Sequence, residues 1–202
     1  MMPRYSLALA LFVQIAARNP SQAATEPLYV PGTQNGTISM VHNESRQTLV
    51  KTLGEVDLTQ LGAGLDPTGT DSFRWQIYLS DASGSLGPSV YDVQVLFPDL
   101  GSGNYNTAIS IHFGANTYLI VELQNTSGSA TSMARYPKDT QGLPFVTGGG
   151  NFQVLDGAAN YSFADPNLPS FSISATPVPE PETAVLLALG SIGLASARRR
   201  SS

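Results

Sequence analysis

The sequence predicts an all-β protein, an antiparallel β-sandwich for which a jelly-roll-like strand order is one option. Three observations support this fold class. The chain of 202 residues contains 19 glycines and 14 prolines, and only 12% of its residues are charged, a composition that suits short strands and turns better than long helices. Several stretches alternate apolar and polar residues with a period of two. Turn-forming segments such as "DASGSLGPS" separate these stretches, and no pattern typical of a long helix occurs between residues 25 and 176.

The clearest strand pattern is "FRWQIYL" at residues 73–79, where the apolar side chains fall on one face. Trp75, the only tryptophan, lies on that face, and we expect it at the centre of the core. Residues 90–97 alternate in the same way. The stretches 108–113 and 117–124 predict a hairpin that turns at Gly114 to Asn116. Weaker patterns predict strands at residues 37–42, 151–155 and 171–175.

The first 23 residues have the features of a secretory signal peptide rather than of a folded domain. Arg4 supplies a positive charge, an apolar run follows from Tyr5 to Ala17, and small residues precede a cleavage site after Ala23. Cleavage after Ala24 is the second option. We therefore expect an N-terminal signal helix, which an export translocon and a signal peptidase handle, and a β-sandwich domain at residues 24–176, called the body below.

The tail, residues 177–202, contains a second apolar segment, from Ala184 to Ala197, with no charged residue. As a helix it spans roughly 21 Å, less than the bilayer hydrocarbon core of about 30 Å. Local thinning of the bilayer and snorkelling arginines can compensate for a short helix. By the positive-inside rule, Arg198, Arg199 and Arg200 mark the cytoplasmic side. We therefore expect the body on the opposite, non-cytoplasmic side of the inner membrane.

The tail resembles a known family. Val178, Pro179, Glu180 and Pro181, then the apolar segment, then the three arginines, resemble the PEP-CTERM sorting signal of Gram-negative bacteria. The resemblance implies recognition at the Pro-Glu-Pro element by an exosortase, a membrane-embedded processing enzyme, with the apolar helix as a transient anchor. It also implies a surface or secreted protein in hosts that make extracellular polysaccharide and biofilm. The two prolines keep the motif out of a helix, so a processing enzyme can hold it by its backbone.

Composition argues against several classes of function. Without cysteine there are no disulfides, zinc–thiolate sites or cysteine nucleophiles. The body keeps all but two of the 15 acidic residues but only half of the 10 basic ones, so it repels phosphate backbones and we expect no nucleic-acid partner. His42 and His112 lie far apart and no G-x-S-x-G motif occurs, so we expect no hydrolytic triad and no enzyme.

Two sets of body residues are candidates for ligand contacts. Tyr78 and Tyr118 alternate onto outward faces and Tyr105 lies in a glycine-rich loop, so these rings could stack on sugars. Oxygen-bearing side chains surround glycines in "DPTGTD" and "DLGSGN", which makes calcium an alternative to plain turns, although neither segment matches an EF-hand loop. The calcium candidates are Asp66, Asp71 and Asp99.

Together these features favour an exported surface or matrix protein with a structural body and no cofactor. A secreted carbohydrate-binding module that contacts extracellular polysaccharide is the alternative. A small hydrolase is less favoured, because the sequence offers few histidines and no nucleophile motif.

Overall fold

The computed structural model describes residues 25–27, 36–67, 69–98, 100–137, 143–147, 150–159 and 167–178, and in these residues the chain forms strands and no helix. The predicted signal peptide with Ala23 and Ala24, and the predicted tail from Pro179 onward, lie outside the described residues. The strands are β1 (Thr25–Pro27), β2 (Thr37–Met40), β3 (Ser45–Thr52), β4 (Val56–Asp66), β5 (Asp71–Ser80), β6 (Ser89–Phe97), β7 (Gly103–Phe113), β8 (Tyr118–Asn125), β9 (Thr131–Pro137), β10 (Phe145–Thr147), β11 (Phe152–Ala159), β12 (Asn167–Pro169) and β13 (Phe171–Pro177).

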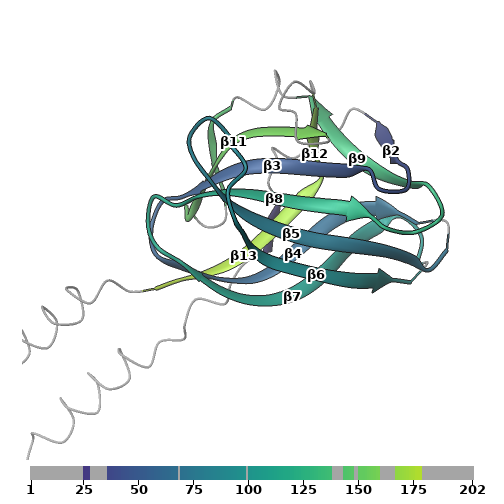
Figure 1. The fold of residues 1–202 in the computed structure, drawn as a ribbon, viewed down its shortest axis with the longest axis horizontal. Helices are drawn as coiled ribbons and strands as arrows, with labels where there is room; N and C mark the ends of the chain where they lie inside the picture. The colour runs from purple at the N-terminus through teal and green to yellow at the C-terminus, as the bar shows by residue number, and fades with distance from the viewer. Residues whose placement is uncertain are drawn as a thin grey trace, which may run out of the picture.

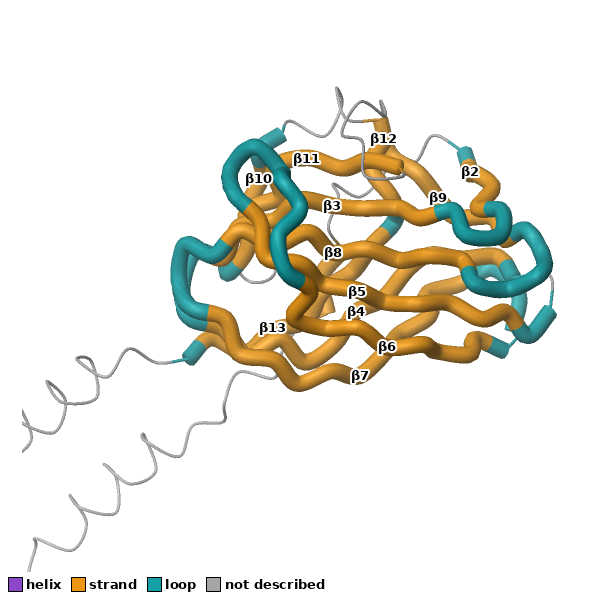
Figure 2. The backbone as a smooth tube through the Cα atoms, viewed as in Figure 1, coloured by secondary structure: helices purple, strands orange, loops and turns teal. Residues whose placement is uncertain are grey.

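The strands form two antiparallel sheets packed face to face, which confirms the predicted all-β architecture (Figure 1). The six-stranded sheet has the order β10-β11-β3-β8-β5-β6. The seven-stranded sheet has the order β1-β13-β4-β9-β12, with β2 paired to β9 and β7 paired to β4. Figure 1 draws β3, β8, β5 and β6 as the near layer, with β4 and β13 behind it. Loops gather at the two ends of the sandwich (Figure 2).

Six consecutive strands are nested around the connection between β5 and β6. β5 pairs with β6, β4 with β7, and β3 with β8, so the chain runs out along three strands and returns along three. The middle pair lies in the seven-stranded sheet and the other two pairs lie in the six-stranded sheet. The long ribbon therefore crosses from one sheet to the other and back, which is the winding of a jelly roll with three strand pairs.

The predicted hairpin between residues 108–113 and 117–124 is wrong, although both strands exist. β7 and β8 belong to different sheets, so Gly114 to Asn116 turn a corner of the sandwich instead of closing a hairpin. The end of β3 holds this corner, because the backbone N–H of Asn116 donates to the carbonyl of Thr52 at 2.9 Å. The Thr52 hydroxyl donates to the carbonyl of Gly114 at 2.7 Å and accepts from the N–H of Thr117 at 2.8 Å.

The core lies between the two sheets and has aromatic rings at its centre. Trp75 of β5 has no exposed surface, and its ring meets that of Phe171 of β13 edge-on, with 5.2 Å between centroids. Phe97 lies 5.4 Å from Phe73 and 5.3 Å from Tyr105, again between ring centroids. Because Phe73 and Tyr105 come from opposite sheets, these rings join the layers, and the predicted core position of Trp75 is confirmed.

Candidate functional site

A groove of about 320 Å³ opens on the outer face of the seven-stranded sheet, where β4 lies between β7 and β9. Ala63 and Leu65 of β4 point into the core, so alternation along the strand turns Gly64 and Asp66 outward. Glycines and short polar side chains make up most of the lining. The lining residues are Thr37, Gly64, Leu65, Asp66, Ser102, Gly103, Asn104, Ser132, Ala134, Tyr136 and Ser170.

Two glycines of β4 allow side chains of neighbouring strands and loops to approach its backbone closely. A Cβ atom built at Gly64 would lie 2.5 Å from Oγ of Ser170, and one built at Gly62 would lie 2.2 Å from Oδ1 of Asn106. Both contacts are far shorter than van der Waals distance, so larger residues would displace these polar groups. Because the glycines have no side chain, nothing from β4 fills the space above its outer face at these positions, and the groove stays open.

The groove presents hydrogen-bonding groups side by side with apolar surface. Asn104 lies opposite Gly64 in the register of β7 with β4, and Asp66 lies opposite Ser132 in the register of β4 with β9. Both the Asp66 and Asn104 residues are exposed, and within the described ranges neither side chain bonds to another residue. A carboxylate, a carboxamide and several hydroxyls are therefore available to a polar ligand.

The three candidate glycan tyrosines do not lie in this groove, and two of them are buried. Tyr105 belongs to β7, its ring packs in the core at 6% exposure, and its hydroxyl donates to the carbonyl of Gly101 at 2.6 Å. Tyr78 faces outward as expected but is 8% exposed, because it packs with Leu49 and Ile120 in a second apolar cluster. The expectation of accessible rings is thus wrong for Tyr78 and Tyr105.

Tyr118 keeps accessible ring surface and is the remaining member of that set. It lies at the start of β8 and is partly exposed, and Nζ of Lys51 lies 5.6 Å from its ring centroid. A cation at this distance from the ring is within range of a favourable cation–π contact. The role of Tyr118 in glycan contact stays a prediction.

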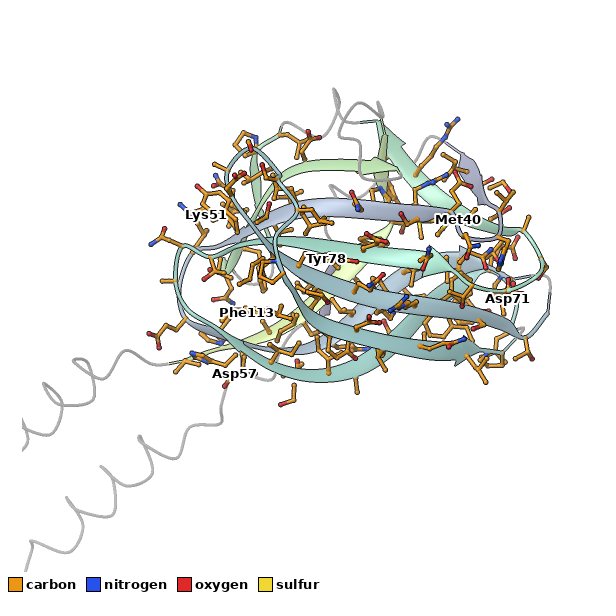
Figure 3. The ribbon with its side chains drawn as sticks, viewed as in Figure 1. Met40, Lys51, Asp57, Asp71, Tyr78 and Phe113 are labelled. Atoms are coloured by element: carbon orange, nitrogen blue, oxygen red, sulfur yellow. The ribbon has the colours of Figure 1, made fainter. Side chains whose placement is uncertain are left out.

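The calcium candidates Asp66 and Asp71 lie in different environments. Asp66 is exposed in the groove, whereas Asp71 is 1% exposed and its two carboxylate oxygens accept the hydroxyls of Ser129 and Thr131, each at 2.6 Å. Figure 3 shows Asp71 at the same end of the sandwich as Met40. Asp99 lies outside the described residues. In the part of the chain that the structure describes, no three His, Asp or Glu side chains gather as a metal site would require.

The two histidines lie at separate places. Nδ1 of His112 lies 3.0 Å from Oδ1 of Asp57 on the exposed outer face of β7 and β4. Nδ1 of His42 lies 2.7 Å from the carbonyl oxygen of Ser127, in the loop after β8. The ring of His112 thus contacts a carboxylate and that of His42 a backbone carbonyl, and neither of these contacts is to the hydroxyl of a serine or threonine.

The last strand ends where the predicted tail begins. β13 ends at Pro177, and the N–H of Val178 donates to the carbonyl of Glu55 at 2.9 Å. Pro179, Glu180 and Pro181, and the arginines Arg198, Arg199 and Arg200, lie outside the described residues. Within the described ranges, no helix has the length and apolar character needed to cross a bilayer.

Comparison with known proteins identifies the tail of the chain. Residues 177–200 match the family model of the PEP-CTERM protein-sorting motif, which confirms the resemblance seen in the sequence. No curated protein matches the chain. The matched segment begins at the last residue of β13, so the sorting motif and the sandwich adjoin without overlap beyond Pro177. The chain thus carries a PEP-CTERM sorting motif and is an exported protein addressed to an exosortase.

Proposed function

We propose that the protein is a structural component of the bacterial surface or extracellular matrix, delivered by the PEP-CTERM route. The observation that carries this proposal is the junction at Pro177, where the last strand ends and the sorting motif begins. Processing at Pro179 to Pro181 would remove none of the strands that the structure describes and none of the sheet hydrogen bonds that hold β13. The tail can therefore act as a transient membrane anchor and leave a complete sandwich behind.

The composition of the body suits a passive role outside the cell. A core of large side chains joins the two sheets, so the fold does not need cysteine pairing in an oxidising compartment. The acidic surplus of the chain gives it a net charge of −5, which favours solubility in a hydrated matrix. We propose that the body has no catalytic activity and that it is located within extracellular polysaccharide.

The processing route is tested by changing the recognition element alone. We expect Glu180→Ala to block maturation and to leave the protein in the inner-membrane fraction. Glu182→Ala is the matched control, because it removes the same charge from the residue directly after the Pro-Glu-Pro element. Fractionation and immunoblotting would show both outcomes. If Glu180→Ala matures and leaves the cell as the unaltered protein does, the route is refuted.

A second candidate function is carbohydrate binding, and the groove beside Gly64 favours it. Its carboxylate, carboxamide and hydroxyls match the alternating donors and acceptors of a sugar. The groove lies on a rigid sheet rather than on a long loop, so little ordering entropy would oppose binding. We propose the groove, rather than the three tyrosines, as the place where such a ligand would bind.

Matched substitutions separate this candidate from a purely structural body. If the groove binds a glycan, Asp66→Asn and Asn104→Ala should each weaken binding to host matrix polysaccharide about tenfold, as the loss of one or two hydrogen bonds predicts. Asp57→Asn, at the other end of β4, should leave binding unchanged. Calorimetry with the mature protein provides the measurement. Absence of saturable binding by the unaltered protein would eliminate the carbohydrate candidate.

A further inference from the structure

Strand β6 is an edge strand of the six-stranded sheet. Within the described residues β6 is hydrogen-bonded to β5 alone, so its other side is an edge of the six-stranded sheet. Pro88 and Pro98 flank the strand and leave the nine residues from Ser89 to Phe97 free of proline. An edge of this length presents a row of unpaired N–H and C=O groups.

The usual devices that protect such an edge are scarce on β6. Natural edges carry lysines, prolines or inward-pointing charges that discourage pairing with another chain. The only charged residue of β6 is Asp92, and its carboxylate already forms a two-point ion pair with Arg74 of the neighbouring β5 (2.6 Å from Nε to Oδ1). The single register shift between β5 and β6 lies at the beginning of β6, so the rest of the strand is regular.

Apolar side chains are exposed along the same strand. Leu96 is 68% exposed and Val90 is 41% exposed, and both lie on the outer face with Asp92 and Gln94. Tyr91, Val93 and Val95 face the core but are only partly buried, because no further strand covers them. An added strand would cover both sets at once.

The sequence of β6 selects one register for self-pairing. Antiparallel pairing of identical strands keeps the core-facing residues on the core side only if one residue lies opposite its own copy. A centre at Asp92 would place two carboxylates face to face, and a centre at Gln94 would place Asp92 against Leu96. A centre at Val93, the midpoint of the strand, pairs all nine residues.

The register centred on Val93 also matches side chains across the junction. Asp92 lies opposite Gln94 of the second copy, which avoids facing like charges, and exposed Leu96 lies opposite exposed Val90. On the core side, Tyr91 lies opposite Val95 and Val93 lies opposite itself. By two-fold symmetry each unlike pair occurs twice, so each favourable contact is doubled.

We propose that two copies of the mature protein pair through β6 in this register and join their six-stranded sheets into one continuous sheet. The partner is a second copy of this chain, and the two-fold contact closes, so the product is a dimer and not a fibre. This inference goes beyond the proposed delivery route and does not depend on how the tail is processed. It gives a surface protein a defined way to cross-link neighbouring molecules.

Sedimentation velocity of the mature protein over a range of concentrations tests this proposal. We expect a monomer–dimer equilibrium. Gln94→Glu should weaken dimerisation at least about tenfold, because it faces Asp92 of the partner at two symmetric places. Gln94→Lys should strengthen dimerisation, because it faces the same carboxylate with opposite charge. Gln94 is exposed, so circular dichroism should show both variants folded.

The matched control is Gln153→Glu on β11, a strand that lies far from β6 in the same sheet. It makes the same chemical change and should leave the dimerisation constant as it is. The proposal is overturned if the unaltered protein is a monomer at millimolar concentration or grows into open-ended fibres. It is equally overturned if Gln94→Glu and Gln94→Lys change dimerisation no more than Gln153→Glu does.

Discussion

At the scale of single residues, buried polar side chains hold one end of the sandwich together. Nδ2 of Asn125 donates to the carbonyl of Met40 at 2.7 Å and to that of Ser129 at 2.9 Å. Its Oδ1 accepts the N–H and the hydroxyl of Ser127 at 2.9 and 2.6 Å. Asn125 therefore connects the end of β2 with the loop after β8, and Asp71 adds the start of β5 to the same network.

We predict that Asp71→Ala lowers the free energy of unfolding by about 3 kcal/mol. The substitution removes an acceptor from two buried hydroxyls, those of Ser129 and Thr131, and leaves both unsatisfied. Asp71→Asn keeps one acceptor oxygen and should cost about half as much. Urea denaturation followed by circular dichroism gives both values. Asp57→Ala, at an exposed hydrogen bond with His112, should change stability by less than about 0.5 kcal/mol, and an equal loss for Asp57 and Asp71 would contradict this account.

At the scale of elements, Thr52 fixes the corner where the strand ribbon passes from one sheet to the other. It ends β3, has no exposed surface, and bonds the β7–β8 turn through its N–H, carbonyl and hydroxyl. The connection from β3 to β4 and the connection from β7 to β8 thus pass from one sheet to the other side by side. This explains why the turn at Gly114 to Asn116 does not close a hairpin, since its partners lie more than sixty residues away along the chain.

We predict that Thr52→Val destabilises the protein by about 2 kcal/mol, although it preserves the shape of the side chain. The lost hydroxyl leaves the Gly114 carbonyl and the Thr117 N–H without their buried partner. Amide exchange should speed up at Asn116 and Thr117 and stay unchanged at the opposite end of the sandwich. Uniform loss of protection throughout the molecule, or no loss at the corner, would count against this role for Thr52.

The loop between β5 and β6 depends on one exposed carboxylate. Oδ1 of Asp81 accepts the hydroxyl and the N–H of Ser83 and the N–H of Ser85, and the Ser83 hydroxyl is the largest cause that lowers the pKa of Asp81 from its ordinary 3.8 to about 2. Figure 1 draws this loop crossing in front of β8 and β3. Since folding lowers this pKa, the carboxylate supports the loop fully above pH 3.8, and the support is lost as pH falls through about 2.

We predict that the amide resonances of Ser83 and Ser85 titrate together with a midpoint near pH 2. Asp81→Asn should abolish this titration, because it removes the carboxylate that accepts the N–H groups of Ser83 and Ser85. Proton–nitrogen correlation spectra recorded from pH 5 downward provide the measurement. A midpoint near 3.8 would show that the loop does not hold the carboxylate as described.

Strands with regular alternation were predictable from the sequence, and the others depended on contacts far along the chain. The apolar residues of β5 and β8 face one core, so the pattern is visible. β3 shows no regular alternation, because the polar residues Arg46 and Thr48 lie on its inner face while the apolar Leu49 packs with Tyr78 and Ile120 on the outer face. β4 escapes it because Gly62 and Gly64 stand where polar residues would mark the outer face. The G-x-G spacing within "LGAGL" was the one local signal of the groove.

The same limit applies to the candidate site residues. Tyr78 was correctly placed on the outer face, but its burial depends on Leu49 from β3 and Ile120 from β8, which no local pattern reveals. The sequence predicted a glycine-rich loop at Tyr105, but the residue belongs to β7, and the pairing of β7 with β4 places it opposite Ala63 with its ring in the core. The sorting motif was predictable because its signal lies in consecutive residues and needs no tertiary contact.

At the scale of the whole molecule, the chain consists of a folded body and a C-terminal sorting motif. The nested ribbon brings distant segments together, from β3 with β8 to β13 with β4, so the body can hold its shape after the tail is lost. The sorting motif starts at Pro177, the last residue of β13. We propose that the residues beyond the Pro-Glu-Pro element direct the protein to an exosortase and are absent from the mature molecule.

Intact-mass spectrometry of the protein recovered from the cell surface or the medium tests this claim most directly. We predict a mature species that begins after Ala23 or Ala24 and ends near Pro179 to Pro181, without the apolar segment and the three arginines. The same spectrum reports any group attached at the new C-terminus. Recovery of extracellular protein that still carries Arg198 to Arg200 would contradict the account.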